Sequence, residues 1–310
     1  SPYRESFSLG LPLLAGALAT NALRGVMRRG LVATPLGQVH YVDHWPADDG
    51  TAAVPLVCLH MSPRSADEFA EVGAILSKQG RRVIAIDEPG YGMSDNPNES
   101  CSLEGIAASV VSVVDALELE RFAVAGSLMG CYTTLQLAAS LGSDRVSAIV
   151  LTHPFKWRDV ETTQKKQESE IDTTDSWVLQ DDGSHLVELW AKRKGWLSAE
   201  MNNRMVADEL AYLMKRRVRY AQGISIQPPQ FFPFDEKAAS VRCRTLVLLG
   251  SQAVHFFDQI GMEGTQRFAA ATAALPAALV KQHTIEGGSI NLLNTHADEW
   301  ATVVSDFLLE

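Results

Sequence analysis

The chain has 310 residues, which is enough for two folding units or for one large α/β domain with a sizeable core. Hydrophobic residues make up 46% and charged residues 21% of the sequence, a balance that excludes a disordered, collagen-like or coiled-coil chain and indicates a soluble folded protein. The formal net charge is −10, which argues against a surface that attracts nucleic acid or anionic lipid, and we expect no nucleic-acid partner.

An apolar stretch over residues 9–23 opens the chain and is followed by three arginines. Ala17 and Ala19 have the spacing that a signal peptidase accepts, but about fifteen apolar residues are too few to span a bilayer. We expect residues 1–30 to form an apolar helix or arm that packs on this protein or on a second copy of it. Membrane-surface contact or targeting is the alternative. A cytoplasmic location is favoured, and a secreted or organellar one would follow from targeting.

From residue 31 onward, short runs rich in Val, Leu and Ile alternate with stretches of helical spacing. Such runs are typical of strands that are buried on both faces. We predict strands over 38–45, 54–60, 82–87, 122–126, 146–152, 245–250 and 278–285. We predict helices over 66–78, 103–117, 131–141, 258–274 and 295–309. This alternation indicates an α/β fold with a mostly parallel sheet, right-handed crossovers and flanking helices.

One segment, residues 155–240, interrupts the alternation because it is polar and rich in charges. We interpret it as a helical insertion that caps the edge of the sheet where the strands end, between core segments 31–154 and 241–310. The insertion contains four tryptophans: Trp157, Trp177, Trp190 and Trp196. Trp157 and Trp177 are candidate residues of a hydrophobic ligand site. Tryptophans that fill the core of the cap itself are the alternative.

The four cysteines are far apart, and no two of them have the C-x-x-C spacing of a metal site. They are Cys58, Cys101, Cys131 and Cys243. The sequence therefore predicts reduced, mostly buried thiols and neither a disulfide framework nor a zinc site. We expect no metal and no cofactor.

Three motifs occur in a set order at the ends of predicted strands. Leu59-His60 ends the run 54–60, residues 87–94 read Asp-Glu-Pro-Gly-Tyr-Gly-Met-Ser, and residues 126–130 read Gly-Ser-Leu-Met-Gly. In this order they resemble the motifs of the α/β-hydrolase family, over the chain from about residue 31 to its end. The resemblance implies the sheet of that family and places its nucleophile elbow at residues 126–130.

An elbow needs glycines two residues before and after its centre so that a strand can turn sharply into a helix. Gly126 and Gly130 meet this requirement, but the central residue is Leu128, whose hydrocarbon side chain cannot attack an acyl carbon. A frame shifted by one residue puts Ser127 at the centre, and Met129 then occupies a position that needs a small residue.

The resemblance also places the acid and the base of a catalytic triad, and neither is present. The acid position is Ala253, and the loop 286–291, where the base belongs, contains Ile290 and no histidine. Asp258 has the position of a helix N-cap. His296 opens the last predicted helix, where a capping or packing role is expected.

The loop that helps to form the oxyanion hole is altered as well. Met61 follows His60 where the family has a small residue, and the backbone N–H of Met129 remains as a donor. Leu128, Ala253 and Ile290 would converge on a dry apolar floor beneath the tryptophan-rich cap. This arrangement predicts a hydrophobic small-molecule ligand.

Three functions fit these residues. The preferred one is non-covalent chemistry, such as that of a lyase, isomerase, cyclase or decarboxylase, in which Ser127, His60 or His153 acts as acid or base. Glu88 and Tyr91 lie at the same edge of the sheet, and Tyr91 is a candidate binding residue. Each of these side chains has a structural role as its alternative.

The other two functions come from different classes. The first alternative is a pseudoenzyme that binds a ligand or a partner and converts nothing. The second is an unorthodox ester or lactone hydrolase that uses Ser127, or a water held by His255 and Asp258.

Overall fold

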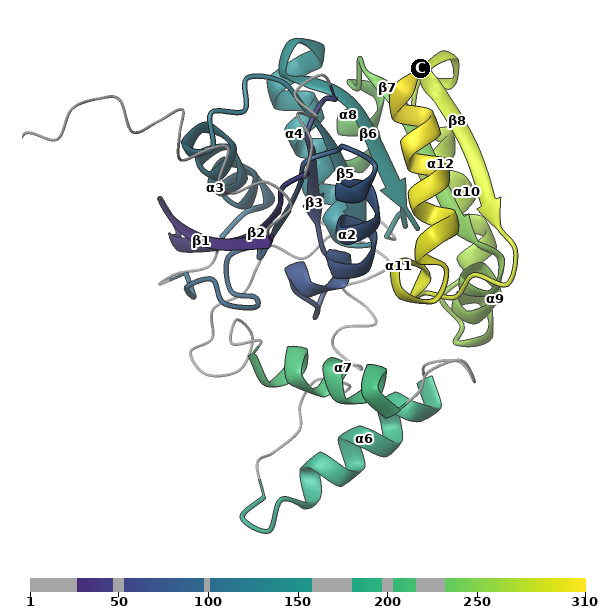
Figure 1. Cartoon of the computed structure of the whole chain (residues 1–310). Helices are drawn as coiled ribbons and strands as arrows, with labels where there is room; N and C mark the ends of the chain where they lie inside the picture. The colour runs from purple at the N-terminus through teal and green to yellow at the C-terminus, as the bar shows by residue number, and fades with distance from the viewer. Residues whose placement is uncertain (1–26, 47–52, 98–100, 158–179, 197–202, 216–231) are drawn as a thin grey trace, which may run out of the picture.

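The computed structural model describes residues 27–46, 53–97, 101–157, 180–196, 203–215 and 232–310 (Figure 1). The apolar stretch 9–23 and Trp177 lie outside the described residues.

The centre of the fold is an eight-stranded sheet with the order β1-β2-β4-β3-β5-β6-β7-β8, counted over the described residues. The strands are β1 Met27–Thr34, β2 Gly37–His44, β3 Leu56–Leu59, β4 Val83–Ile86, β5 Phe122–Ser127, β6 Val146–Thr152, β7 Arg244–Gly250 and β8 Val280–Ile285. Strand β2 is antiparallel to both of its neighbours, β1 and β4, and all pairs from β4 to β8 are parallel. The mostly parallel sheet predicted from the sequence is therefore confirmed.

Strand β1 was not predicted from the sequence, and it includes residues 27–30 of the expected N-terminal arm. Its side chains alternate between exposed and half-buried because β1 is an edge strand with one neighbour. A strand of this kind needs no continuous apolar run, and it therefore lacks the pattern by which the buried strands were found.

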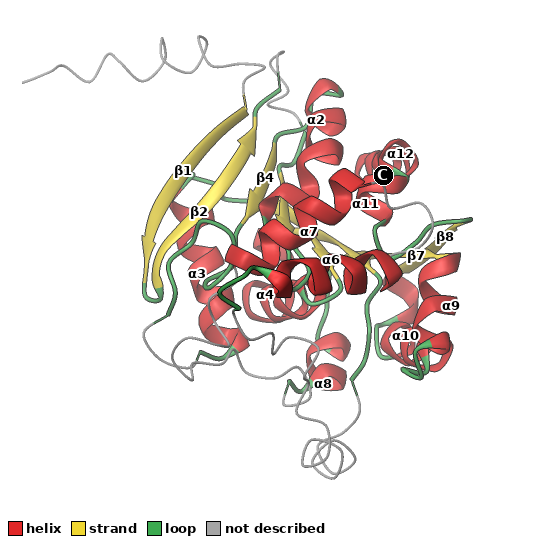
Figure 2. Ribbon diagram, turned by 90° about the horizontal axis from the view of Figure 1, so that it is seen from below, coloured by secondary structure: helices red, strands yellow, loops and turns green. Residues whose placement is uncertain are grey.

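The helices cover both faces of the sheet (Figure 2). They are α2 Ala70–Lys78, α3 Leu103–Ala116, α4 Gly130–Arg145, α6 Ser184–Trp196, α7 Asn203–Lys215, α8 Phe234–Ala239, α9 Ser251–Gln259, α10 Gly264–Ala273, α11 Leu292–Thr295 and α12 Ala297–Leu309. The 3-10 helices are η1 Ala66–Phe69 and η3 Ala277–Leu279. Two large core clusters link the helices to the sheet: one joins it to α2, α11 and α12, and the second joins it to α3, α4, α8 and α10.

The helix predicted over 258–274 is two helices, and the expected start at Asp258 is wrong. Asp258 lies in the last turn of α9, which ends before Gly261, a glycine with a φ of 75°. The second helix, α10, starts at Gly264. The helical spacing continues across this break, so the pattern of apolar residues does not reveal the turn.

Helices α6 and α7, from the segment expected to form a cap, lie below the edge of the sheet where the parallel strands end (Figure 1). Helix α8 belongs to the same sequence segment but packs on the core, where the ring of Phe234 lies 5.4 Å from that of Tyr132. None of the helices in the described ranges has the length and apolar content that crossing a bilayer requires.

Candidate functional site

The turn from β5 into α4 has the geometry of a nucleophile elbow. A Cβ on Gly126 would lie 2.4 Å from the carbonyl oxygen of Gly130, and a Cβ on Gly130 would lie 2.1 Å from that of Leu59. Both positions therefore require glycine. At the tip, Leu128 has a φ of 43°, in the left-handed region that most L-residues avoid at a cost of about 1 kcal/mol. The fold thus places a hydrocarbon side chain where this turn presents its central residue.

The side chain of Leu128 is half-buried and packs on three phenylalanines, which come from the loop after β6 and from helices α9 and α10. They are Phe155, Phe257 and Phe268. Ile290, in the loop after β8, packs on the same cluster. Ala253 is buried in the first turn of α9, and its neighbour Val254 reaches the cluster. Leu128 and Ile290 therefore pack on the same phenylalanine cluster, and Ala253 is not part of it.

Ile290 also contacts the helices below the sheet. It packs on Val206 of α7, which is fully buried, and Trp190 of α6 packs on the same residue. Trp157, the predicted binding residue, is instead 36% exposed and packs edge-on against Phe155 at 5.4 Å. No feature of the sequence separated Trp190 from the other tryptophans, because Trp190, Val206 and Ile290 meet only through the fold of the chain.

Ser127, the candidate nucleophile of the shifted frame, has a buried partner. Its hydroxyl donates a hydrogen bond to Oε1 of Glu68 at 3.0 Å, and only 1% of the residue is exposed. Oε2 of Glu68 accepts the backbone N–H of Met61 at 2.8 Å. Glu68 therefore holds the loop after β3 against the end of β5, and the Ser127 hydroxyl is part of that connection.

Glu68 is a buried residue that was not predicted from the sequence to belong to the site. Burial raises the pKa of its carboxyl group, and nearby Arg64 and the hydrogen bonds offset this in part. Arg64 in turn donates hydrogen bonds to the side-chain oxygens of Asn291 and Asn294, beyond β8. The spacing of Glu68 in the sequence could have indicated this burial. Glu68 precedes Val72 by four residues, which predicts a position on the same, buried face of the helix expected over residues 66–78.

His60 links the loops after β3 and β4. Its Nε2 accepts the backbone N–H of Glu88 at 3.1 Å, so the ring proton lies on Nδ1, which donates to the carbonyl of Met61 at 2.9 Å. The ring packs edge-on against Tyr91, whose hydroxyl donates to Oγ of Ser62 at 3.2 Å. Both nitrogens of His60 are engaged, which is the structural alternative that the sequence analysis gave for this residue.

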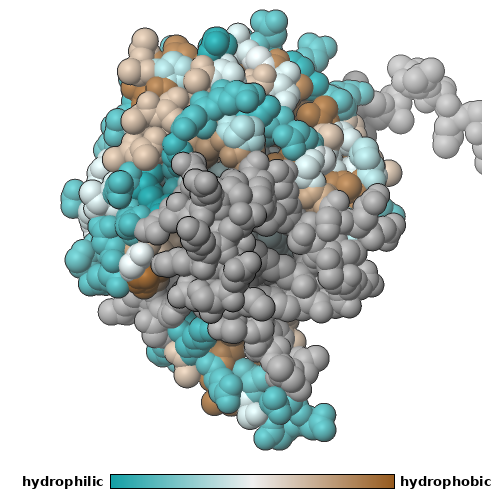
Figure 3. Space-filling model, turned by 180° about the vertical axis from the view of Figure 1, so that it is seen from behind, coloured by the Kyte–Doolittle hydropathy of each residue, from teal (hydrophilic) through white to brown (hydrophobic). Residues whose placement is uncertain are grey.

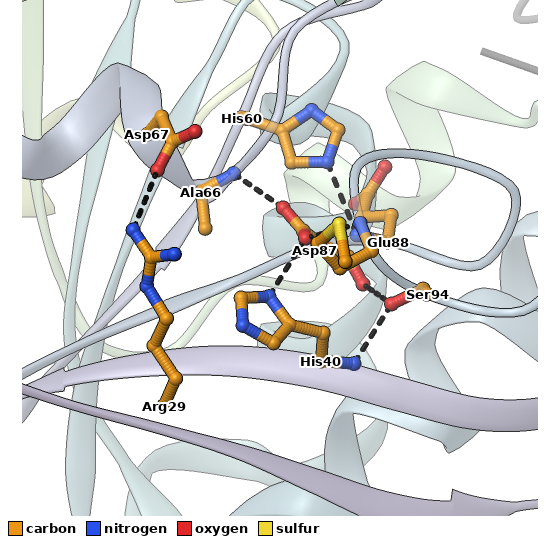
Figure 4. A network of polar contacts seen from close by, with 9 residues as sticks. Arg29, His40, His60, Ala66, Asp67, Asp87, Glu88 and Ser94 are labelled. Carbon is orange, nitrogen blue, oxygen red and sulfur yellow. Dashed lines mark hydrogen bonds and ion pairs between the residues drawn. The ribbon is translucent and has the colours of Figure 1, made fainter. Parts of the chain in front are cut away.

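The Asp87 turn after β4 is fixed by a network of hydrogen bonds (Figure 4). The Asp87 carboxylate accepts from His40 Nδ1 at 2.8 Å, from Ala66 N at 2.6 Å and from Met93 N at 2.8 Å. Burial opposes the charge, but these hydrogen bonds outweigh it and hold the pKa of Asp87 below its usual value. Ser94 Oγ donates to the Asp87 carbonyl and accepts the N–H of His40. The Asp-Glu-Pro-Gly-Tyr-Gly-Met-Ser motif is thus a loop anchor.

The neighbouring carboxyl group, Glu88, is much less well satisfied. It is fully buried, and its Oε1 has no hydrogen-bond partner among the described residues. Burial raises the pKa of Glu88, and the influence of His60 and Thr133 lowers it by less. Burial, with a smaller contribution from the Glu88 charge, raises the pKa of the nearby Cys101 thiol to about 11. All four cysteines are buried and unpaired.

His153, at the end of β6, is completely buried. Its Nε2 accepts the backbone N–H of Gly250 at 2.9 Å, which ties the end of β6 to that of β7. Burial lowers the pKa of His153 to about 3, so the ring is neutral near pH 7. An uncharged ring whose Nε2 is already engaged is a poor general base.

Of the remaining candidate residues, Asp258 and His255 are exposed, and His296 and Met129 are half-buried. Asp258 accepts the N–H and the hydroxyl of Thr265, at 3.0 and 2.6 Å, and so caps α10 from the end of α9. His255 pairs with Gln259 on the exposed side of α9. His296 occupies the N-cap position of α12, and its Nδ1 contacts the Thr295 hydroxyl. Met129, at the N-cap of α4, is half-buried against the core.

Within the described ranges, no group of three or more His, Cys, Asp or Glu side chains is arranged to hold a metal ion.

A model of the α/β-hydrolase fold family matches residues 54–225, which is more than half of the chain. The chain therefore belongs to this family, in agreement with the resemblance of its motifs. Its sheet order and elbow geometry are those expected from that membership.

Individual relatives are more distant. The chain is 31% identical to a non-heme chloroperoxidase of Streptomyces lividans over 122 residues, which is 39% of this chain and 43% of that protein. It is 33% identical to a haloalkane dehalogenase of Psychrobacter cryohalolentis over 104 residues, a third of each chain. The match thus spans less than half of the length of these relatives. The crystal structure of a bromoperoxidase from Bacillus anthracis superposes with a TM-score of 0.68, covering 91% of this chain and all of that one, at 20% identity.

Proposed function

We propose that this α/β-hydrolase-fold protein binds a hydrophobic small molecule on the surface formed by Leu128 and Ile290, and that it forms no acyl-enzyme intermediate there. The observation that carries the proposal is the position of Leu128 at the tip of an intact elbow. A leucine cannot act as a nucleophile, be activated by a base or hold an acyl group. The same side chain provides apolar area for a ligand to cover.

The surroundings of this surface favour an apolar ligand. Leu128 and Ile290 are both half-buried, so each keeps some surface that a ligand can contact. The side chains behind them are phenylalanines, and Ile290 and Trp190 of α6 both pack on Val206 of α7. Contact with such side chains stabilises a ligand by about 25 cal/mol for each Å² of apolar surface removed from water.

The contacts of the three candidate acid–base groups support catalysis less than they support binding alone. Ser127 donates to Glu68, both nitrogens of His60 have partners, and His153 is neutral with Nε2 engaged. Each group thus has a contact that explains its position without a reaction. Binding without turnover is therefore the function that this geometry favours over the non-covalent enzyme preferred from the sequence.

Binding of butylbenzene, measured by isothermal titration, tests the proposal. The unaltered protein should bind it, and Leu128→Asp should weaken binding more than about tenfold, because a carboxylate in an apolar site is strongly disfavoured. Leu309→Asp is the matched control, since Leu309 is 75% exposed at the end of α12. Equal affinity in Leu128→Asp, with an unchanged circular dichroism spectrum, would refute the proposed site.

A second candidate function, non-covalent catalysis, is favoured by one observation: Glu88 has a buried carboxyl group with a raised pKa, and one of its oxygens has no hydrogen-bond partner in the part of the chain that the structure describes. A carboxyl group in this state is suited to donate a proton. The test is mass spectrometry of small molecules that co-purify with the chain, followed by their re-addition to the protein. Recovery of an unchanged compound indicates a binding protein, whereas conversion that is lost in Glu88→Gln indicates an enzyme.

A further inference from the structure

A buried imidazole lies directly behind the elbow. His153 follows Thr152, whose carbonyl oxygen accepts the backbone N–H of Leu128 at 2.9 Å, so the two residues are neighbours at the ends of β5 and β6. The ring of His153 lies 6.1 Å from that of Phe268, a member of the cluster on which Leu128 and Ile290 pack. His153 therefore belongs to the surroundings of the proposed apolar site.

The hydrogen bonds of His153 fix its tautomer. The Gly250 backbone N–H can only donate, so the Nε2 that receives it at 2.9 Å has a free lone pair and no proton. The proton of the neutral ring is therefore on Nδ1. This Nδ1 is buried and has no hydrogen-bond partner among the residues that the structure describes.

The neutral form is the one present over the ordinary pH range. Burial without a charged partner lowers the pKa of His153 to about 3. A second proton would also fall on Nε2, where it would face the Gly250 N–H. His153 thus presents a permanent, uncharged N–H donor.

An unpaired buried donor is unfavourable, and buried polar groups in folded proteins nearly always have a partner. The ring of Phe268, which lies beside that of His153, has no acceptor atom. A ligand that brought an acceptor atom to Nδ1 would remove this penalty. An anionic acceptor would be opposed by the apolar surroundings, whereas a neutral carbonyl would not.

We propose that the Nδ1–H of His153 is the polar anchor of the apolar site, and that the ligand is a hydrophobic molecule carrying a neutral carbonyl oxygen. This inference rests on the proposed function, because it assigns the one hydrogen bond by which the ligand is oriented at that site. His153 acts in it as a binding residue and transfers no proton.

The test compares two probes of nearly equal shape, butyrophenone and butylbenzene, which differ in a carbonyl in place of a methylene group. Their dissociation constants are measured for the unaltered protein, for His153→Phe and for His283→Phe, a control on the exposed edge strand β8. The preference for butyrophenone over butylbenzene should fall about fivefold to tenfold in His153→Phe and stay unchanged in His283→Phe. An unchanged preference in His153→Phe would overturn the inference.

A second measurement covers the case in which His153→Phe does not fold, because this variant leaves the Gly250 N–H without its acceptor. In the unaltered protein labelled with ¹⁵N-histidine, butyrophenone should shift the Nδ1–H resonance of His153 and butylbenzene should shift it much less. Binding of both probes with equal shifts would overturn the inference while the proposed function stands. Binding of neither probe would overturn both.

Discussion

Leu128 combines an unfavourable backbone conformation with favourable packing. A φ of 43° costs a leucine about 1 kcal/mol, and contact with the phenylalanine cluster offsets this cost. The residue could be identified from the sequence because the elbow is a local motif of five residues. The hydrogen bond from Ser127 to Glu68 could not, because it joins residues 59 positions apart and depends on how the chain folds back.

Glu88 allows a prediction at the same scale. Its folded-state pKa lies above the ordinary value of 4.5, so as pH rises above 4.5 the unfolded chain loses this proton first. The folded protein should therefore lose stability over this range, and Glu88→Gln, which mimics the protonated acid, should lose less, because the contribution of Glu68 remains. Urea unfolding between pH 4 and 8 measures this effect. The free energy of unfolding of Glu88→Gln should rise relative to that of the unaltered protein as pH increases.

The exposed side chain of Glu120 provides the control for this comparison. The free energy of unfolding of Glu120→Gln should change with pH in the same way as that of the unaltered protein. A stability difference between Glu88→Gln and the unaltered protein that stays constant from pH 4 to 8 would show that Glu88 titrates in the folded state as it does in the unfolded chain.

At the scale of elements, the buried strands were the most predictable part of the molecule. The apolar run predicted at 146–152 coincides with β6, and that at 122–126 falls one residue short of β5. Continuous apolar runs reveal strands covered on both faces, whereas the edge strand β1 alternates and was missed. The break between α9 and α10 was missed because Gly261 interrupts a pattern that remains apolar on one face.

The contact between α4 and β3 yields a prediction for the elbow. Gly130→Ala would place a Cβ 2.1 Å from the backbone carbonyl of Leu59, which no side-chain movement can relieve. We expect it to lower the free energy of unfolding by about 3 kcal/mol. Gly105→Ala, within α3 and with its nearest contact at 3.6 Å, should instead raise that energy by about 0.5 to 1 kcal/mol.

Chemical denaturation of the two glycine variants provides the measurement. Equal stability of Gly130→Ala and the unaltered protein would show that α4 does not approach β3 as closely as described.

For the whole molecule, the order of the motifs was enough to predict the family and the sheet, which the fold and the family match confirm. Function is less readily inferred, because one fold hosts many unrelated sites. Trp190 and Ile290 both pack on Val206 through tertiary contacts that no local pattern contains. The described surface seen in Figure 3 mixes hydrophilic and hydrophobic residues, whereas the phenylalanine cluster under Leu128 is formed by internal contacts.

The most direct test of the account is the intact mass of the protein after exposure to a fluorophosphonate, which forms a stable adduct with an activated serine. Because Leu128 stands at the elbow and the Ser127 hydroxyl is buried against Glu68, we predict an unchanged mass under conditions that fully label an active serine esterase. A stoichiometric mass increase that peptide mapping assigns to Ser127 would contradict the account.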